Sequence, residues 1–257
     1  MQCALSYHAP LPAFAVMPRF YLPETLAPDT FITLPDASAH HAARVLRLSV
    51  GDSVTLFNGQ GGEWTGSIHH IGKREVEVRV GEWQNVERES TLRVTLAQGI
   101  SSGERMDYTL QKAVELGVHA IRPIACARSV VKLSGERADK RRTHWQNLVI
   151  AACEQCARNR VPEVSDIAPL PVSLAQSAEA PLKLMFAPDA QHTLHTLPRP
   201  DGDVTMLAGP EGGFDAHEYS AALAAGFIPI RLGPRILRTE TAALAALAAM
   251  QTLWGDL

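Results

Sequence analysis

Two short loops carry the residue types that could form a ligand site. The first, Leu207-Ala-Gly-Pro-Glu-Gly-Gly-Phe214, follows an apolar stretch and precedes a helical pattern that starts near Asp215. Its three glycines let the main chain approach a ligand closely and adopt conformations closed to other residues. The loop has neither the Gly-Lys-Ser/Thr of a Walker loop nor the spacing of a dinucleotide fingerprint. It predicts a ligand loop that is not specialised for phosphate, with a plain strand-to-helix turn as the alternative.

The second loop, Leu232-Gly-Pro-Arg-Ile-Leu-Arg-Thr-Glu-Thr241, also runs through Gly-Pro into a helix. We expect it to lie beside the first loop. Near the helix start, Arg238 could stabilise a developing oxyanion and Glu240 could take a proton. A structural ion pair between Arg238 and Glu240 is the alternative.

The elements that position these loops alternate between strand and helix after Ser90, a rhythm typical of an α/β domain. The later strands are short and apolar on all sides, as in a parallel sheet covered on both faces. Gly117 is expected to end the first helix, and Thr239 to cap the last. The expected strands are 92–97, 119–125, 182–187, 203–208 and 227–232, and the expected helices are 104–116, 136–158 and one starting near residue 239.

The segment before Ser90 has a different pattern. Residues 53–57 and 63–71 predict a hairpin around the glycine-rich turn 58–62, and residues 74–80 alternate charged and apolar types like a half-buried strand. Residues 36–48 predict one short helix. We therefore expect a small β-barrel over residues 17–88, plugged by that helix, and a second domain over residues 89–257. Residues 1–16 do not resemble a signal peptide and are predicted to be a loose extension before Met17.

Composition limits the classes of function. A chain with 46% hydrophobic and 20% charged residues is typical of a globular protein, and the net charge of −3 argues against nucleic-acid binding through global charge. Residues 122–160 are an exception, because this stretch contains nine basic residues and only three acidic ones, as a phosphate-contacting surface would. No apolar run is long enough to cross a membrane. Four scattered cysteines indicate a reducing cytoplasm, and the Cys153-Glu-Gln-Cys156 spacing indicates a packed helix face more than a metal site.

Several blocks of the sequence, taken together, resemble one family. From Met17 to the end, the chain is similar to the bacterial 16S ribosomal RNA uracil-N3 methyltransferases of the SPOUT superfamily, and the blocks fall in that family's order. The blocks are Met17-Pro-Arg-Phe-Tyr21, Gly103-Glu-Arg-Met-Asp, Gln111-Lys-Ala-Val-Glu-Leu-Gly-Val118, Glu154-Gln-Cys-Ala-Arg-Asn-Arg-Val-Pro162, Gly209-Pro-Glu-Gly-Gly213 and Leu232-Gly-Pro-Arg-Ile-Leu-Arg-Thr-Glu-Thr-Ala242.

The resemblance implies a PUA-like β-barrel for RNA, followed by an α/β domain tied in a trefoil knot and paired in a homodimer. It also implies that the two loops hold S-adenosylmethionine, without a metal. The residues expected to bind this cofactor are Leu207, Gly209, Pro210, Glu211, Gly212, Gly213, Leu232, Gly233, Ile236, Leu237 and Thr239.

The implied reaction methylates N3 of a uridine in 16S rRNA of the small ribosomal subunit. We assign Arg238 to the anion of the base, and Glu240, with Glu211 as the alternative, to its proton. The alternatives are methylation of another RNA base or of a ribose, and a non-catalytic RNA-binding assembly factor. The side chains expected to contact RNA are Arg19, Arg44, Arg47, Arg128, Arg158 and Arg160.

Overall fold

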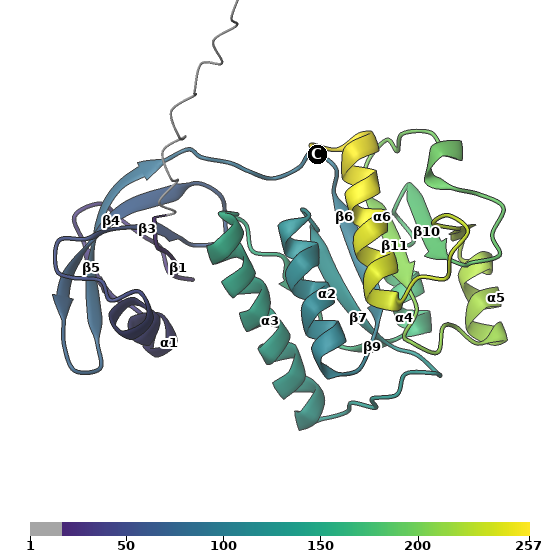
Figure 1. Ribbon diagram of the computed structural model, residues 1–257, viewed down its shortest axis with the longest axis horizontal. Helices are drawn as coiled ribbons and strands as arrows, with labels where there is room; N and C mark the ends of the chain where they lie inside the picture. Colours follow the sequence, from purple (N-terminus) through teal and green to yellow (C-terminus); the bar gives the residue numbers. More distant parts are fainter. Residues whose placement is uncertain (1–16) are drawn as a thin grey trace, which may run out of the picture. The chain divides into compact units, whose positions relative to one another are not determined.

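A computed structural model describes residues 17–257, so the predicted extension over residues 1–16 lies outside the described residues. The chain divides into two compact units (Figure 1). Within the described residues, the smaller unit holds residues 17–58 together with Gly62–Asn85, and the larger holds Gly59–Gly61 and Val86–Leu257.

The smaller unit is built on a five-stranded sheet in the order β1-β3-β4-β5-β2. Strand β1 pairs in parallel with β3, and the other neighbours are antiparallel. The predicted hairpin is confirmed, because β3 and β4 pair with Leu56 opposite Trp64. Strands β1 and β2 are the two ends of this strand order, so the predicted small barrel is present as a half-barrel. The bounds are β1 (Arg19–Tyr21), β2 (Phe31–Thr33), β3 (Ser53–Phe57), β4 (Glu63–Ile71) and β5 (Val76–Gln84).

A short helical segment covers the core of this sheet. The single helix expected over residues 36–48 is in fact α1 (Asp36–His40) followed by a π-helical turn, η1 (His41–Val45). Ala39 and Ala42 are buried against the apolar side chains of the sheet. Arg47 follows with a φ of 55°, which is uncommon for a residue other than glycine.

The larger unit is built on a seven-stranded parallel sheet, and the predicted α/β architecture is confirmed. Six strands follow the order β12-β10-β11-β6-β7-β8, and β9 also pairs with β7. Every residue of β6 and β11 is buried, because helices cover both faces. The bounds are β6 (Val94–Gly99), β7 (Ala120–Ala125), β8 (Glu163–Val164), β9 (Ala168–Pro169), β10 (Leu182–Phe186), β11 (Val204–Ala208) and β12 (Ile228–Ile230).

The helices of this unit form two groups. Helix α2 packs against α3 and α6, and the three lie side by side in Figure 1. On the other face, α4 and α5 share an apolar core with β6, β7, β10 and β11. Gly117, with a φ of 81°, follows α2 as predicted. The bounds are α2 (Gly103–Glu115), α3 (Glu136–Cys156), α4 (Leu170–Gln176), the 3-10 turn η2 (Leu194–Thr196), α5 (Ala216–Ala224) and α6 (Thr239–Trp254).

The Cys-x-x-Cys spacing lies at the end of α3. Cys153 is buried there, and burial raises the pKa of its thiol to about 12. Within residues 17–257, no group of three or more His, Cys, Asp or Glu side chains could hold a metal ion. In the same range, no helix is both long enough and apolar enough to span a bilayer.

Candidate functional site

A pocket of about 900 Å³ lies at the carboxyl ends of β10, β11 and β12. Open α/β sheets bind their ligands at this edge. Most of its wall comes from three stretches of chain, which are the residues just after β10, the loop between β11 and α5, and the segment between β12 and α6. Arg105 and residues of α5 and α6 complete it. The two loops singled out in the sequence therefore face one pocket, and the prediction that they adjoin is confirmed.

The glycines of the first loop have local structural causes. Gly213 has a φ of 66°, which closes a tight turn in which its N–H donates to the Pro210 carbonyl at 2.9 Å. A Cβ on Gly212 would sit 2.9 Å from Cβ of Arg128. The loop therefore packs against the segment after β7. Position 212 is a glycine because Arg128 leaves no space there for a side chain.

A network of hydrogen bonds joins the two loops below the pocket. The Thr239 hydroxyl donates to the Gly209 carbonyl at 2.5 Å, and the Gln98 amide donates to the Thr239 hydroxyl at 3.0 Å. The prediction that Thr239 caps α6 is wrong, because Arg238 is the N-cap residue and the Thr239 hydroxyl is used by Gly209. Gln98 was not predicted. Its only signal in the sequence is a polar residue at the end of an apolar strand.

The side chain of Glu211 is held in place by Ser102 and Arg105. Its carboxylate accepts hydrogen bonds from the N–H and the hydroxyl of Ser102, both at 2.8 Å, and pairs with Arg105 at 3.3 Å. Burial alone raises the pKa of Glu211, but the Ser102 bonds and the Arg105 charge outweigh it and hold the pKa below its ordinary value. Glu211 is therefore a weak proton acceptor and a strong anchor for the loop.

Three buried acceptor oxygens around the loops have no hydrogen-bond partner. They are Oε2 of Glu211, Oε2 of Glu240 and Oε1 of Gln98. A buried polar atom without a partner costs about 1–3 kcal/mol, so such atoms are rare in folded proteins. Glu211 and Glu240 line the pocket, so two of these oxygens belong to residues at which a bound ligand could supply N–H donors or positive charge.

Arginine side chains gather at the same pocket. Arg238 is exposed on the wall, together with Arg231 and Arg235. Among the described residues, no ion pair joins Arg238 to Glu240, so the structural pairing considered from the sequence does not form. The pocket thus combines two carboxylates that each have one oxygen without a partner with guanidinium groups that are exposed to an incoming anion.

The residues expected to bind a cofactor are mostly found on this wall. Leu207 is the exception, because its side chain is buried in the core beneath the loop. Sequence reasoning missed Phe186 and Tyr219, which also line the pocket but lie outside the two motifs. The expected residues on the wall are Gly209, Pro210, Glu211, Gly212, Gly213, Leu232, Gly233, Ile236, Leu237 and Thr239.

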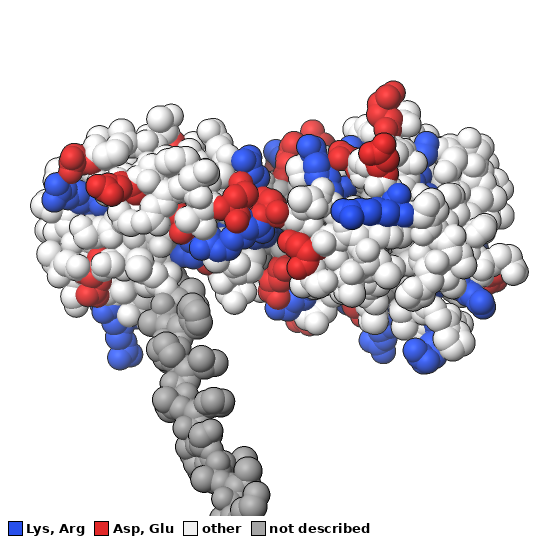
Figure 2. All heavy atoms as spheres, turned by 90° about the horizontal axis from the view of Figure 1, so that it is seen from above, with Lys and Arg blue, Asp and Glu red and all other residues white. Residues whose placement is uncertain are grey.

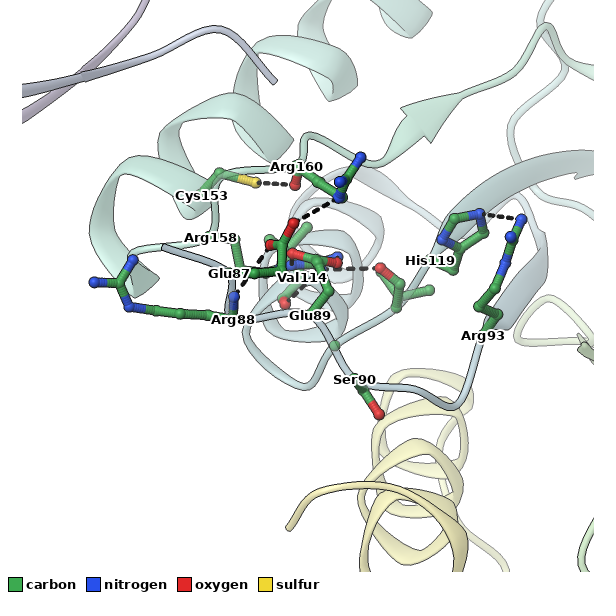
Figure 3. Close-up of polar contacts among 12 residues, drawn as sticks. Glu87, Arg88, Glu89, Ser90, Arg93, Val114, His119, Cys153, Arg158 and Arg160 are labelled. Carbon is green, nitrogen blue, oxygen red and sulfur yellow. Dashed lines mark hydrogen bonds and ion pairs between the residues drawn. The ribbon is translucent and has the colours of Figure 1, made fainter. Parts of the chain in front are cut away.

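Arg158 cannot contact RNA in the way expected from the sequence. Its guanidinium is buried in an ion pair with Glu89 and donates to the carbonyls of Val114 at 3.0 Å and Val118 at 2.9 Å (Figure 3). The Glu89 carboxylate outweighs the effect of burial and raises the pKa of Arg158. Figure 3 shows that Arg158 holds the segment around Glu89 against the end of α2.

The prediction that Arg19 contacts RNA is also wrong. Arg19 is buried, pairs with Glu63 at 2.8 Å and lies over the Phe57 ring. Both errors have the same physical reason, because each guanidinium is buried and paired with a carboxylate of the protein itself.

The other four predicted RNA contacts are exposed to different extents. Arg160 pairs with Glu87 at 2.7 Å at the surface, and Arg128 donates to the Gly212 carbonyl at 3.2 Å beside the pocket. Arg44 and Arg47 are exposed on the smaller unit. Figure 2 shows basic side chains in separate groups among acidic ones on the face it presents.

Comparisons with known families identify the two units. Residues 88–251 match the RNA methyltransferase domain family, and residues 34–81 match the RNA methyltransferase PUA domain family. The architecture and the pocket thus define a two-domain RNA methyltransferase.

Individual relatives show to which family of RNA methyltransferases the chain belongs. The ribosomal RNA small subunit methyltransferase E of Buchnera aphidicola is 36% identical over 94% of this chain and 98% of its own length. The protein of the same name from Bacillus subtilis is 33% identical over 82% of this chain and 86% of its own length. The chain belongs to the ribosomal RNA small subunit methyltransferase E family, as the motif resemblance indicated.

Two solved structures are similar over nearly the whole chain. The family member from Neisseria gonorrhoeae, bound to S-adenosyl methionine, is 44% identical with a TM-score of 0.87, over 94% of this chain and 99% of that one. A methyltransferase from Legionella pneumophila, in complex with the same cofactor, is 41% identical with a TM-score of 0.90, also over 94% of this chain and 99% of that one.

Proposed function

We propose that this protein transfers a methyl group from S-adenosylmethionine to N3 of a uridine in 16S ribosomal RNA. The observation that carries the proposal is the pocket of about 900 Å³ with unpartnered carboxylate oxygens of Glu211 and Glu240 at its wall. This volume suits a small-molecule site. S-adenosylmethionine has a positively charged sulfonium, an ammonium group and an adenine amino group, which match acceptors of this kind.

The two loops would hold this donor between them. Residues 209–213, 232–233 and 235–239 line the pocket, and the Thr239 hydroxyl holds the two loops together. When bound, the donor supplies a methyl group that its sulfonium already activates. The protein therefore has to align the acceptor, stabilise its anion and accept one proton. Alignment alone can lower a barrier by about 7–11 kcal/mol.

The acceptor chemistry is assigned to two side chains. Glu240 accepts the proton from N3 of the uracil, because its Oε2 is buried without a competing partner. Loss of this proton spreads negative charge over the two carbonyl oxygens that flank N3, and the Arg238 guanidinium stabilises that charge. A ribose hydroxyl would form an alkoxide and would need a stronger base than a carboxylate, so the uracil imide fits this pair better.

The remaining parts of the proposal concern access and assembly. N3 is paired inside an RNA helix, so the target base must leave the stack before it enters the pocket. We propose that the PUA domain grips neighbouring RNA. We also propose that the α/β domain is knotted and forms a homodimer in the cytoplasm, as the family resemblance implies.

The test uses small ribosomal subunits from a strain that lacks this protein. They are incubated with the purified protein and S-adenosylmethionine carrying an isotopically labelled methyl group, and the modified nucleotide is located by mass spectrometry. One labelled uridine in 16S rRNA, methylated at N3, is the expected result. Label on another base or on a ribose 2′-oxygen would contradict the assignment. Donor binding without any label in the RNA would favour a non-catalytic assembly factor.

A further inference from the structure

The smaller unit contains a second hollow, which the proposed reaction does not use. It has a volume of about 250 Å³ and lies between the helical segment α1–η1 and the turn that joins β4 to β5. Figure 1 shows α1 beside this hairpin. The charged residues that line it are Asp36, Arg44, Lys73, Arg74 and Glu75.

Three cationic side chains line this hollow beside two carboxylates. Within residues 17–257, Arg44, Lys73 and Arg74 form no ion pair, although all three line one small space. Other arginines of the unit behave differently, because Arg19 pairs with Glu63 at 2.8 Å and Arg79 with Asp29 at 2.7 Å. Of the four Lys and Arg side chains described in this unit that form no ion pair, three line this hollow, and Arg47 is the fourth.

Such a group of like charges is unfavourable unless an anion joins it. Asp36 and Glu75 also line the hollow but form no ion pair with these cations among the described residues. Asp36 lies in the first turn of α1, where a carboxylate is stabilised by the helix N-terminus. The cations thus keep their capacity to bind a group from outside.

The size and backbone of the hollow indicate which group it takes. Sites for whole small molecules usually enclose about 300–1,000 Å³, so this space suits a single phosphate better than a nucleoside. Arg44 lies in the π-helical turn η1, a local irregularity that is frequent at functional sites. Arginine and lysine are also the side chains that most often contact phosphate in nucleic-acid complexes.

We propose that Arg44, Lys73 and Arg74 form a phosphate-binding notch, which holds a backbone phosphate of the substrate RNA and its neighbours. The proposal rests on the proposed function only in naming ribosomal RNA as the source of the phosphate. Free inorganic phosphate shares the same chemistry and is the other source to be tested. The notch positions RNA and takes no part in methyl transfer.

The test measures RNA binding by the full-length protein at several salt concentrations, with deproteinised 16S rRNA as the probe. The altered protein carries Arg44→Gln, Lys73→Gln and Arg74→Gln. Each phosphate contact on a single strand contributes about 0.7 to the slope of log affinity against log salt, so the slope should fall by about 2. Affinity at low salt should fall at least about tenfold. Affinity for S-adenosylmethionine should not change, because its proposed pocket is made by other residues.

Two control proteins separate charge from shape. Arg44→Lys with Arg74→Lys keeps all three charges and should bind RNA within about threefold of the unaltered chain. Arg79→Gln removes an arginine that Asp29 already neutralises, and should change the slope by less than about 0.5. Circular dichroism at the assay temperature checks that every variant is folded.

The outcomes are distinguishable from failure of the proposed function. An unchanged salt slope in the triple glutamine variant would overturn the notch, even if the unaltered protein methylates uridine. A reduced slope would support it, even if the unaltered protein methylates a different nucleotide. Calorimetric titration with inorganic phosphate tests the other source. The RNA proposal would be overturned if the unaltered protein bound inorganic phosphate with a dissociation constant below about 1 mM, and the triple glutamine variant lost this binding but kept normal RNA affinity. The notch would then be a site for free phosphate.

Discussion

The Thr239 hydroxyl donates a hydrogen bond of 2.5 Å to the carbonyl of Gly209, and this contact joins two loops that are 30 residues apart in the sequence. Gln98 supports the contact from the end of β6, where its amide donates to the same hydroxyl. The separation of the loops that form the pocket is therefore set by one side chain and its support.

Replacing Thr239 by valine should weaken donor binding more than it weakens the fold. Valine keeps the shape but removes the hydroxyl. The Gly209 carbonyl then loses this hydroxyl as a donor, and the Gln98 amide loses it as an acceptor. We expect the dissociation constant for S-adenosylmethionine, measured by calorimetry, to rise about tenfold, consistent with a cost of about 1–3 kcal/mol for an unpaired buried group. Thr239→Ser keeps the hydroxyl and should bind within about threefold. Equal affinity of all three proteins would show that the contact does not shape the donor site.

Glu211 should make the free energy of unfolding depend on pH in the acid range. Its pKa lies below the ordinary value of 4.5, so the folded protein favours the carboxylate more than the unfolded chain does. The resulting stabilisation is fully present above that ordinary value and is lost as the pH falls through the lower pKa of the folded state. Glu211→Gln should therefore be less stable at pH 7, and its deficit should shrink below about pH 4. Urea unfolding at a series of pH values checks this, and a deficit independent of pH would contradict it.

The sequence predicted local features better than buried polar contacts. The periods of apolar residues placed α2, β11 and the β3–β4 hairpin, because each depends on neighbours along the chain. The glycine and proline content identified the two pocket loops for the same reason. Arg158 was misassigned because its partner Glu89 lies 69 residues away, and Arg19 because Glu63 lies 44 residues away. An arginine that the fold encloses has no local signature that separates it from an exposed one.

Gln98 illustrates the same limit at the pocket. Its importance depends on Gly209 and Thr239, which the fold brings to the end of β6 from 111 and 141 residues away. The short helix α4 was missed for a different reason, because seven residues with a proline near the start give too little periodicity to read.

Arg158 and Arg160 should differ sharply in what they contribute to stability. Arg158 is buried, and its removal leaves the Glu89 carboxylate enclosed without a partner (Figure 3). Arg158→Met should lower the free energy of unfolding by about 3–5 kcal/mol. Arg160→Met breaks an exposed pair with Glu87 and should cost less than about 1 kcal/mol. Urea unfolding of both variants measures the difference, and similar small losses would show that the Glu89 pair is not an important part of the fold.

Arg238 is the residue whose replacement separates chemistry from binding. It is exposed on the pocket wall, and no described acidic side chain pairs with it. If its guanidinium stabilises negative charge that develops on the uracil carbonyls, its removal should lower turnover and leave donor affinity nearly intact. Loss of one preorganised group that stabilises an oxyanion costs about 10²–10³ in rate in enclosed sites. Because this side chain is exposed to water, we expect Arg238→Ala to methylate at least roughly tenfold more slowly.

Single-turnover methylation of small ribosomal subunits, with calorimetry for donor binding, provides the measurement. Arg238→Lys should recover part of the rate, because lysine keeps the charge but loses the planar fork that contacts a carbonyl in two places. Arg235→Ala is the matched control, since Arg235 lines the same pocket but has no assigned part in the reaction. An Arg238→Ala protein that methylates at the normal rate would remove this arginine from the mechanism. One that loses donor affinity with no separate effect on turnover would assign Arg238 to the donor site instead.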